Sequence, residues 1–122
     1  MLTALDHVQV AAPHGCEDAA RRFYRDALGL VEAPKPSNLA ARGGCWFALP
    51  DGRQLHVGVD AAFAPATKAH PAFRVRGLAA LRSRLEAAGI PTREDEPLAG
   101  ARRFYADDPF GNRLEFLERA GT

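Results

Sequence analysis

The sequence contains one short pattern twice, and this repeat constrains the fold more than any other feature. The stretch DGRQLHV in the first half can be laid over FGNRLEF near the C-terminus, with Gly52 on Gly111. The two stretches differ by a constant 59 positions, since 111 − 52 = 59. In the same alignment His56 falls on Glu115. Because an internal repeat decides the architecture of a chain, we expect two copies of one folding module.

Each half predicts the same order of elements, namely a strand, a helix and three further strands. Alternating apolar residues in LDHVQVAAP predict a strand, and apolar residues at helical spacing in EDAARRFYRDALGL predict a helix that ends at Gly29. In the second half HPAFRV predicts the strand and LAALRSRLEAAGI the helix, which ends at Gly89. The remaining extended segments are NLAARGG, CWFALP and DGRQLHVGV, followed by IPTRED, ARRFYADDP and FGNRLEFLE.

This order predicts an α+β protein built from two βαβββ modules, each a twisted four-stranded sheet with its helix against one face. We place the modules at residues 1–60 and 69–119 of a single domain, 1–122, because the chain is too short for two independent cores. Residues 61–68, rich in alanine and containing Pro65, are expected to form the linker or, alternatively, a short helical turn.

Composition excludes several classes of partner. The 122 residues carry a net charge of +1 and are 47% hydrophobic, which argues against nucleic-acid binding, membrane insertion and disorder and favours a small-molecule or protein partner. The N-terminus MLTALDHV lacks the pattern of a signal peptide, so we expect a cytoplasmic protein. Cys16 and Cys45 form no CxxC motif and are expected to be buried free thiols rather than reactive nucleophiles or a disulfide.

Four side chains suited to metal binding lie on the strands that begin and end the modules. Strand alternation directs each of them to the face opposite the apolar row: they are His7, His56, His70 and Glu115. Three imidazoles and a carboxylate are ligands for a divalent ion such as Zn, Fe(II), Mn, Ni or Co. A single histidine on a strand is more often hydrogen-bonded or solvated, but three at matching repeat positions favour the metal site. The fourth histidine, His14, is interpreted as a loop residue.

Further side chains on the same faces are candidates for a substrate pocket. Arg74 and Arg113 are expected to share the face of Glu115, where they either bind an anionic substrate or are solvated. Trp46 and Tyr105 correspond across the repeat, since 105 − 46 = 59. They either wall an aromatic pocket or belong to the core, and we favour the core.

The chain resembles the vicinal oxygen chelate superfamily, which includes glyoxalase I, fosfomycin and bleomycin resistance proteins and extradiol dioxygenases. The stretches that carry the resemblance span nearly the whole chain: LDHV, FYRDALGL, GGCWFAL, QLHVGV, KAHPAF and RFYADDPFGNRLEF. It implies a cup-shaped mixed sheet around one divalent metal, with ligands at His7, His56, His70 and Glu115. At position 56 glyoxalase I carries glutamate and methylmalonyl-CoA epimerase glutamine, so His56 departs from the glyoxalase pattern.

The resemblance implies a metal-dependent lyase, isomerase or dioxygenase that binds two neighbouring oxygens of a small substrate. Glu115 is the candidate catalytic base, because a carboxylate can offer one oxygen to a metal and the other to a proton. Two alternatives remain, a metal-free ligand-sequestering protein of the bleomycin resistance type and a thiol transferase of the fosfomycin resistance type. Open four-stranded modules need partners, so a homodimer is expected.

Overall fold

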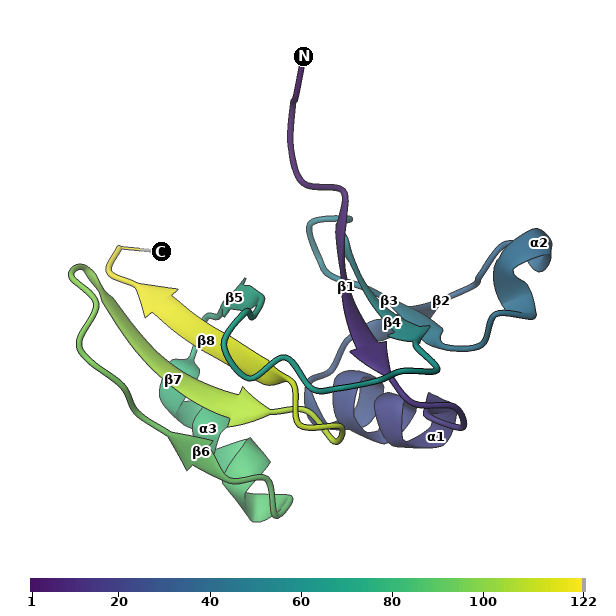
Figure 1. Cartoon of the computed structure of the whole chain (residues 1–122). Coiled ribbons are helices and arrows are strands. Elements are labelled where there is room, and N and C mark those ends of the chain that lie inside the picture. Colours follow the sequence, from purple (N-terminus) through teal and green to yellow (C-terminus); the bar gives the residue numbers. More distant parts are fainter. Residues whose placement is uncertain (122) are drawn as a thin grey trace. The chain divides into compact units, whose positions relative to one another are not determined.

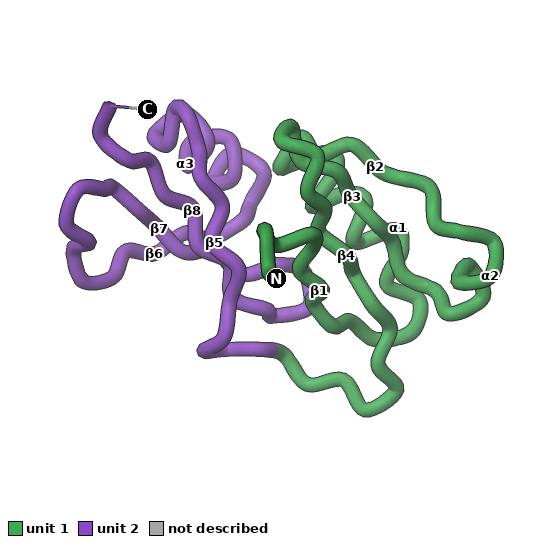
Figure 2. Tube along the Cα trace, turned by 90° about the horizontal axis from the view of Figure 1, so that it is seen from above, with its two compact units in different colours: residues 1–65 green, residues 66–122 purple. Residues whose placement is uncertain are grey.

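The computed structural model describes residues 1–121 and divides the chain into two compact units. Unit 1 is Met1–Pro65 and unit 2 is Ala66–Thr122, coloured green and purple in Figure 2. The boundary falls inside the segment expected to be the linker. Residues 61–68 contain turns and bends and no helix, and the Phe63 N–H donates to the Asp60 carbonyl over 3.1 Å in the turn at the start of the segment. That the two units form a single domain stays a prediction.

Unit 1 is one four-stranded sheet with a helix against one face (Figure 1). Its elements are β1 (His7–Ala12), α1 (Glu17–Ala20), the π-helix η1 (Arg21–Ala27), β2 (Val31–Ala33), α2 (Ser37–Ala40), β3 (Cys45–Ala48) and β4 (Gln54–Val59). The strand order is β1-β4-β3-β2. Strand β1 runs parallel to β4, and the other neighbours are antiparallel. The helix supplies the crossover that the parallel pair requires.

Unit 2 repeats this plan (Figure 1). Its elements are β5 (Ala72–Arg74), α3 (Leu78–Ala87), β6 (Thr92–Arg93), β7 (Ala101–Asp107) and β8 (Arg113–Arg119). The strand order β5-β8-β7-β6 again has one parallel pair, β5 with β8, and two antiparallel pairs. The predicted α+β class and the two βαβββ modules are therefore confirmed.

The repeated sequence pattern forms the same turn twice. In unit 1 the Gly52 N–H donates to the Leu49 carbonyl over 3.0 Å, and in unit 2 the Gly111 N–H donates to the Asp108 carbonyl over 3.0 Å. The φ angles of the two glycines are 89° and 91°, in the left-handed region that favours glycine. The 59-residue offset thus holds for the backbone as well as for the sequence.

The strand register after each turn is also repeated. Trp46 lies opposite His56 in the β3–β4 pair, and Tyr105 lies opposite Glu115 in the β7–β8 pair. Since 115 − 56 and 105 − 46 both equal 59, each side chain of the β3–β4 pair has a positional equivalent in the β7–β8 pair. The open faces of the two units can therefore be compared residue by residue.

Apolar side chains fill the space between sheet and helix in each unit. In unit 1 Tyr24 packs against Phe47 with ring centroids 5.5 Å apart, and Leu55 is fully buried beside them in the core. In unit 2 Phe116 packs against both Phe104 and Phe73, at 5.2 Å and 5.6 Å. This burial is the main source of stability for each sheet.

The second strand of unit 1 differs from the sequence prediction. The stretch NLAARGG was expected to be extended, but it overlaps α2 (Ser37–Ala40), so that prediction is wrong. The strand lies earlier, where Val31 pairs with Ala48 at the edge of the sheet. Alanine and leucine favour a helical turn, while Pro34 and Pro36 restrict the chain to extended backbone before it.

Two predictions about the chain as a whole concern membranes and thiols. Among residues 1–121 no helix is long and apolar enough to cross a membrane. Cys16 and Cys45 are buried and free, as expected. Burial, followed by the nearby Glu17 carboxylate, raises the pKa of the Cys16 thiol to about 11, so that it stays protonated at neutral pH.

Candidate functional site

The side of each sheet that faces away from its helix is called here its open face. In β4 the side chains of Leu55 and Val57 point to the helix, so His56 points to the open face. In β8 Leu114 and Phe116 are buried under the helix in the same way, which places Glu115 on the open face of unit 2.

The open face of unit 1 is built around three stacked rings. The imidazoles of His7 and His56 stack with centroids 4.2 Å apart, and the indole of Trp46 stacks on the other side of His56 at 4.0 Å. His56 is only 6% exposed because it lies between the two other rings. Trp46 therefore lies on the open face rather than in the core that we favoured.

Hydrogen bonds orient both imidazoles of unit 1. Nδ1 of His7 donates to Oδ1 of Asp6 over 2.9 Å, and Nε2 of His56 lies 2.8 Å from Oε1 of Gln54. Burial, and then the nearby His7, hold the pKa of His56 below its ordinary value, so the ring stays neutral at neutral pH. Each ring has one nitrogen fixed by a neighbour and the other without a partner among residues 1–121, which is how metal-binding histidines are commonly oriented.

The open face of unit 2 brings His70 and Glu115 into contact. The His70 ring donates from Nδ1 to the Lys68 carbonyl over 2.8 Å, because a carbonyl oxygen can only accept. The other ring nitrogen, Nε2, lies 2.9 Å from Oε1 of Glu115, which is 6% exposed. A ring lone pair and a carboxylate oxygen repel at this distance unless a proton or a metal ion lies between them. The contact therefore fits an ion pair with a protonated ring as well as a shared metal ion.

Tyr105 is the centre of the rest of this face. Its ring lies edge-on to His70 at 5.4 Å, and three guanidinium groups lie over it within 5.8 Å: those of Arg93, Arg103 and Arg113. Arg103 also donates to the Tyr105 hydroxyl over 2.9 Å and lies 3.5 Å from Glu115. Tyr105, like Trp46, is thus an open-face residue and not part of the core under the helix.

The residues predicted for the site divide between the units. Unit 1 brings together the side chains of His7, His56 and Trp46. Unit 2 brings together those of His70, Tyr105, Arg113 and Glu115. Arg74 is exposed at the end of β5 and makes no side-chain hydrogen bond or ion pair among residues 1–121. Within either unit alone, the described residues contain no group of three His, Cys, Asp or Glu side chains that could hold a metal.

Sequence reasoning missed the residues that support these side chains. Gln54 and Arg103 each precede a predicted site residue by two positions, so strand alternation places them on the same face as His56 and Tyr105. That signal was present in the sequence. The contact of Arg93 with Tyr105 was not predictable, because it depends on the pairing of β6 with β7.

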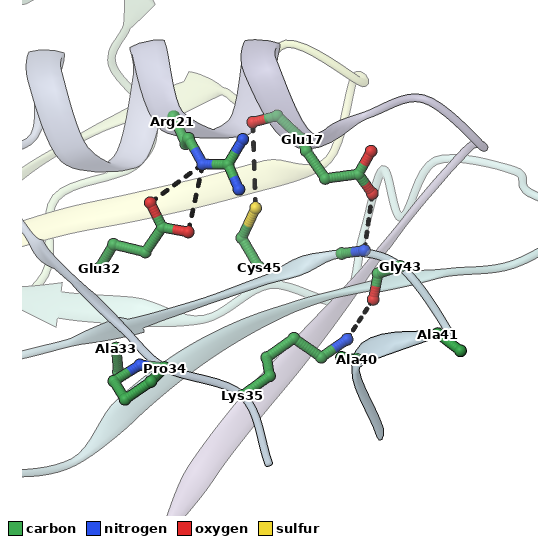
Figure 3. A pocket seen from close by; sticks show the side chains of 11 residues that line it. Glu17, Arg21, Glu32, Ala33, Pro34, Lys35, Ala40, Ala41, Gly43 and Cys45 are labelled. Atoms are coloured by element: carbon green, nitrogen blue, oxygen red, sulfur yellow. Dashed lines mark hydrogen bonds and ion pairs between the residues drawn. The ribbon is translucent and has the colours of Figure 1, made fainter. Parts of the chain in front are cut away.

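A separate hollow of about 730 Å³ lies in unit 1 beside Cys45 (Figure 3). Its charged side chains already make hydrogen bonds within the protein. Arg21 donates from Nε to both oxygens of Glu32, the Glu17 carboxylate accepts from the Gly44 N–H over 2.7 Å, and Lys35 donates to the Gly43 carbonyl. Because these groups have partners, the hollow lacks the unpaired polar groups that mark a ligand site.

Residues 9–117 match the glyoxalase-like domain family, and the chain belongs to this family within the vicinal oxygen chelate superfamily. The crystal structure of a glyoxalase family protein from Bacillus anthracis is 46% identical, with a TM-score of 0.94. The match covers 98% of this chain and 97% of that one. No significant match is found among curated proteins. Members of the superfamily bind small-molecule substrates and typically use a divalent metal.

More distant structures share the fold alone. Lactoylglutathione lyase from Agrobacterium tumefaciens is 24% identical with a TM-score of 0.75, over 96% of this chain and 94% of that one. A fosfomycin resistance protein from Listeria monocytogenes is 17% identical with a TM-score of 0.77, over 100% of this chain and 96% of that one. The two have different activities, so the fold does not select one reaction.

Proposed function

We propose that this protein is a divalent-metal-dependent enzyme that acts on a small substrate through two neighbouring oxygens, as a lyase, isomerase or dioxygenase. Its ligands are His7, His56, His70 and Glu115, and the ion is Zn, Fe(II), Mn, Ni or Co. Imidazole and carboxylate ligands suit all of these ions. The donor set fits such an ion, because each unit contributes two side chains that are already oriented by hydrogen bonds.

The observation that carries the proposal is the 2.9 Å contact between His70 and Glu115. Since Nδ1 of His70 donates to the Lys68 carbonyl, Nε2 is the ring nitrogen that faces the carboxylate. Orientation of a histidine by a backbone carbonyl is a common feature of metal sites.

When bound, the metal would supply Lewis-acid stabilisation of negative charge on the substrate oxygens. Glu115 is then the catalytic base. Its Oε1 faces His70, while its Oε2 has no hydrogen-bond partner among residues 1–121 and is available to accept a proton from substrate carbon. Arg103, 3.5 Å from Oε1, forms an ion pair that helps to hold the carboxylate in place.

The proposal is tested by following turnover of the metal-loaded protein. Metal-free protein is reloaded with each of the five ions and mixed in D₂O with 2-hydroxy ketones, 2-oxo aldehydes and catechols. We expect metal-dependent exchange of a carbon-bound proton, seen by NMR, or metal-dependent oxygen uptake. Glu115→Gln should abolish it, while the exposed Glu94→Gln should not. Absence of both readouts with every ion would overturn the enzyme proposal and favour metal-free ligand sequestration.

We further propose that the two units act as one domain and that the chain forms a homodimer. Strands β1 and β5 each stand at the edge of their own sheet, and Leu5, just before β1, is 71% exposed. An open edge beside exposed apolar residues is commonly covered by another strand. Light scattering during gel filtration should give twice the chain mass, and a monomer at micromolar concentration would contradict the homodimer.

A further inference from the structure

Arg113 stands apart from the other guanidinium groups on the open face of unit 2. Its Nε is buried and is the one fully buried side-chain nitrogen or oxygen among residues 1–121 that lacks a hydrogen-bond partner. Its guanidinium lies over the Tyr105 ring at 5.0 Å but forms no ion pair within the described part of the chain. A partly buried cation without an anion is costly, so its retention calls for a function.

The neighbouring arginines have partners inside unit 2. Arg93 pairs with Asp107 at 2.9 Å, and Arg103 donates to the Glu96 carbonyl at 2.6 Å as well as lying near Glu115. Asp107 is directly opposite Arg113 in the β7–β8 register, where it would be the natural partner. Because Arg93 holds the Asp107 carboxylate, Arg113 is left without a counter-ion.

We propose that Arg113 binds an oxyanion of the substrate, a carboxylate or a phosphate-type group, on the open face of unit 2. This inference rests on the proposed function, because the anion belongs to the molecule that the metal site acts on. The planar guanidinium offers parallel N–H donors that match two oxygens of such a group. The guanidinium packs against the Tyr105 ring in a cation–π contact, which orients its N–H donors before the anion binds. Arg113 would thereby select negatively charged substrates.

The test uses metal-free full-length protein and two probes, acetate and inorganic phosphate, at constant ionic strength. The arginine Nε–Hε signals are followed by NMR, and the Arg113 signal is assigned from its loss in Arg113→Lys. We expect a saturating shift of this signal with at least one probe. Binding measured from the Tyr105 ring signals should weaken about 10-fold or more in Arg113→Gln and remain unchanged in Arg42→Gln, an exposed arginine of unit 1.

Saturation with acetate alone identifies a carboxylate as the anion, and saturation with phosphate alone identifies a phosphate-type group. A linear drift equal to that of Arg42, or undiminished binding in Arg113→Gln, overturns the inference. Since the protein contains no metal in this test, the result is independent of the metal site. Anion binding without metal uptake would overturn the proposed function and leave Arg113 as an anion site only, whereas metal uptake without anion binding would overturn the role of Arg113 and leave the proposed function standing.

Discussion

The two open faces have the same backbone but opposite chemistry. Unit 1 presents imidazole and indole rings beside an amide, whereas unit 2 presents arginines and carboxylates around one tyrosine. The positional equivalents, at an offset of 59 residues, are Trp46 and Tyr105, Ala48 and Asp107, Gln54 and Arg113, and His56 and Glu115. The sides under the helices are alike, since Leu55 and Leu114 are both fully buried. Duplication therefore preserved what folds each module and changed what each module displays.

Under the proposed function the two units would have different roles. Unit 1 would supply imidazole ligands, stacked on each other and on the Trp46 indole. Unit 2 would supply the carboxylate that offsets the charge of a divalent ion and the cations that attract an anionic substrate.

The largest effect is expected from removing the carboxylate of unit 2. Glu115→Ala should weaken metal binding by roughly 100-fold or more, because it removes a charged ligand. The fluorescence of Trp46, the single tryptophan of the chain, reports metal uptake since its indole stacks on His56. Titration of metal-free protein measures the affinity, with Glu94→Gln as the charge-matched control. Equal affinity in Glu115→Ala would show that unit 2 contributes no ligand.

A smaller change makes unit 1 resemble unit 2. His56→Glu should retain a metal but raise the ratio of Mn to Zn affinity about 10-fold, because carboxylate favours the harder ion and imidazole favours Zn. Competition between the two ions, followed by elemental analysis, measures the ratio. An unchanged ratio would mean that His56 is not a ligand and serves only in the ring stack with Trp46.

Substitution of one equivalent pair should have opposite effects on stability. Gln54→Met loses the hydrogen bond to buried His56 and should lower the free energy of unfolding by about 1 kcal/mol. Arg113→Met removes an unpaired, partly buried cation and should raise it by about 1 kcal/mol. Urea denaturation of the metal-free proteins measures both. Destabilisation in Arg113→Met would show that the guanidinium has a structural role.

The smallest effect on stability is expected on the helix side of unit 1, whose residues stabilise the fold and take no part in the proposed metal site. The Gly44 N–H hydrogen bond holds the pKa of Glu17 below its ordinary value, so the ionised carboxylate stabilises the fold at neutral pH. Glu17→Gln should cost about 1 kcal/mol or less at pH 7. The difference from wild type should vanish as the pH falls through the lowered pKa. Denaturation of both proteins at several pH values tests this. An altered metal affinity in Glu17→Gln would contradict the view that the helix side of unit 1 serves the fold and only the open face serves the metal site.

Most of the fold was predictable because the repeat and the strand alternation act locally. The alternation of Leu55, His56 and Val57 already assigned each side chain to a face, and burial of the two apolar residues bears this out. The position of β2 was not predictable, since Val31 pairs with Ala48 through tertiary contacts at a sheet edge. The helical propensity of the segment after β2 does not indicate which residues form this edge strand.

The site was only partly predictable for a similar reason. The sequence indicates which face a histidine occupies, but the contact of His70 with Glu115 depends on a loop before β5 that positions the ring. The unpaired state of Arg113 depends on the ion pair that Arg93 of β6 forms with Asp107 of the neighbouring strand β7. Such competition between side chains cannot be read from spacing alone.

The central claim is that both modules provide ligands to one ion, and metal stoichiometry tests it most directly. Elemental analysis of untagged protein after incubation with each of the five ions should give about one ion per chain for the wild type. His56→Ala from unit 1 and Glu115→Ala from unit 2 should each lose it. Stoichiometric metal in either variant, or an empty wild type with every ion, would contradict the claim.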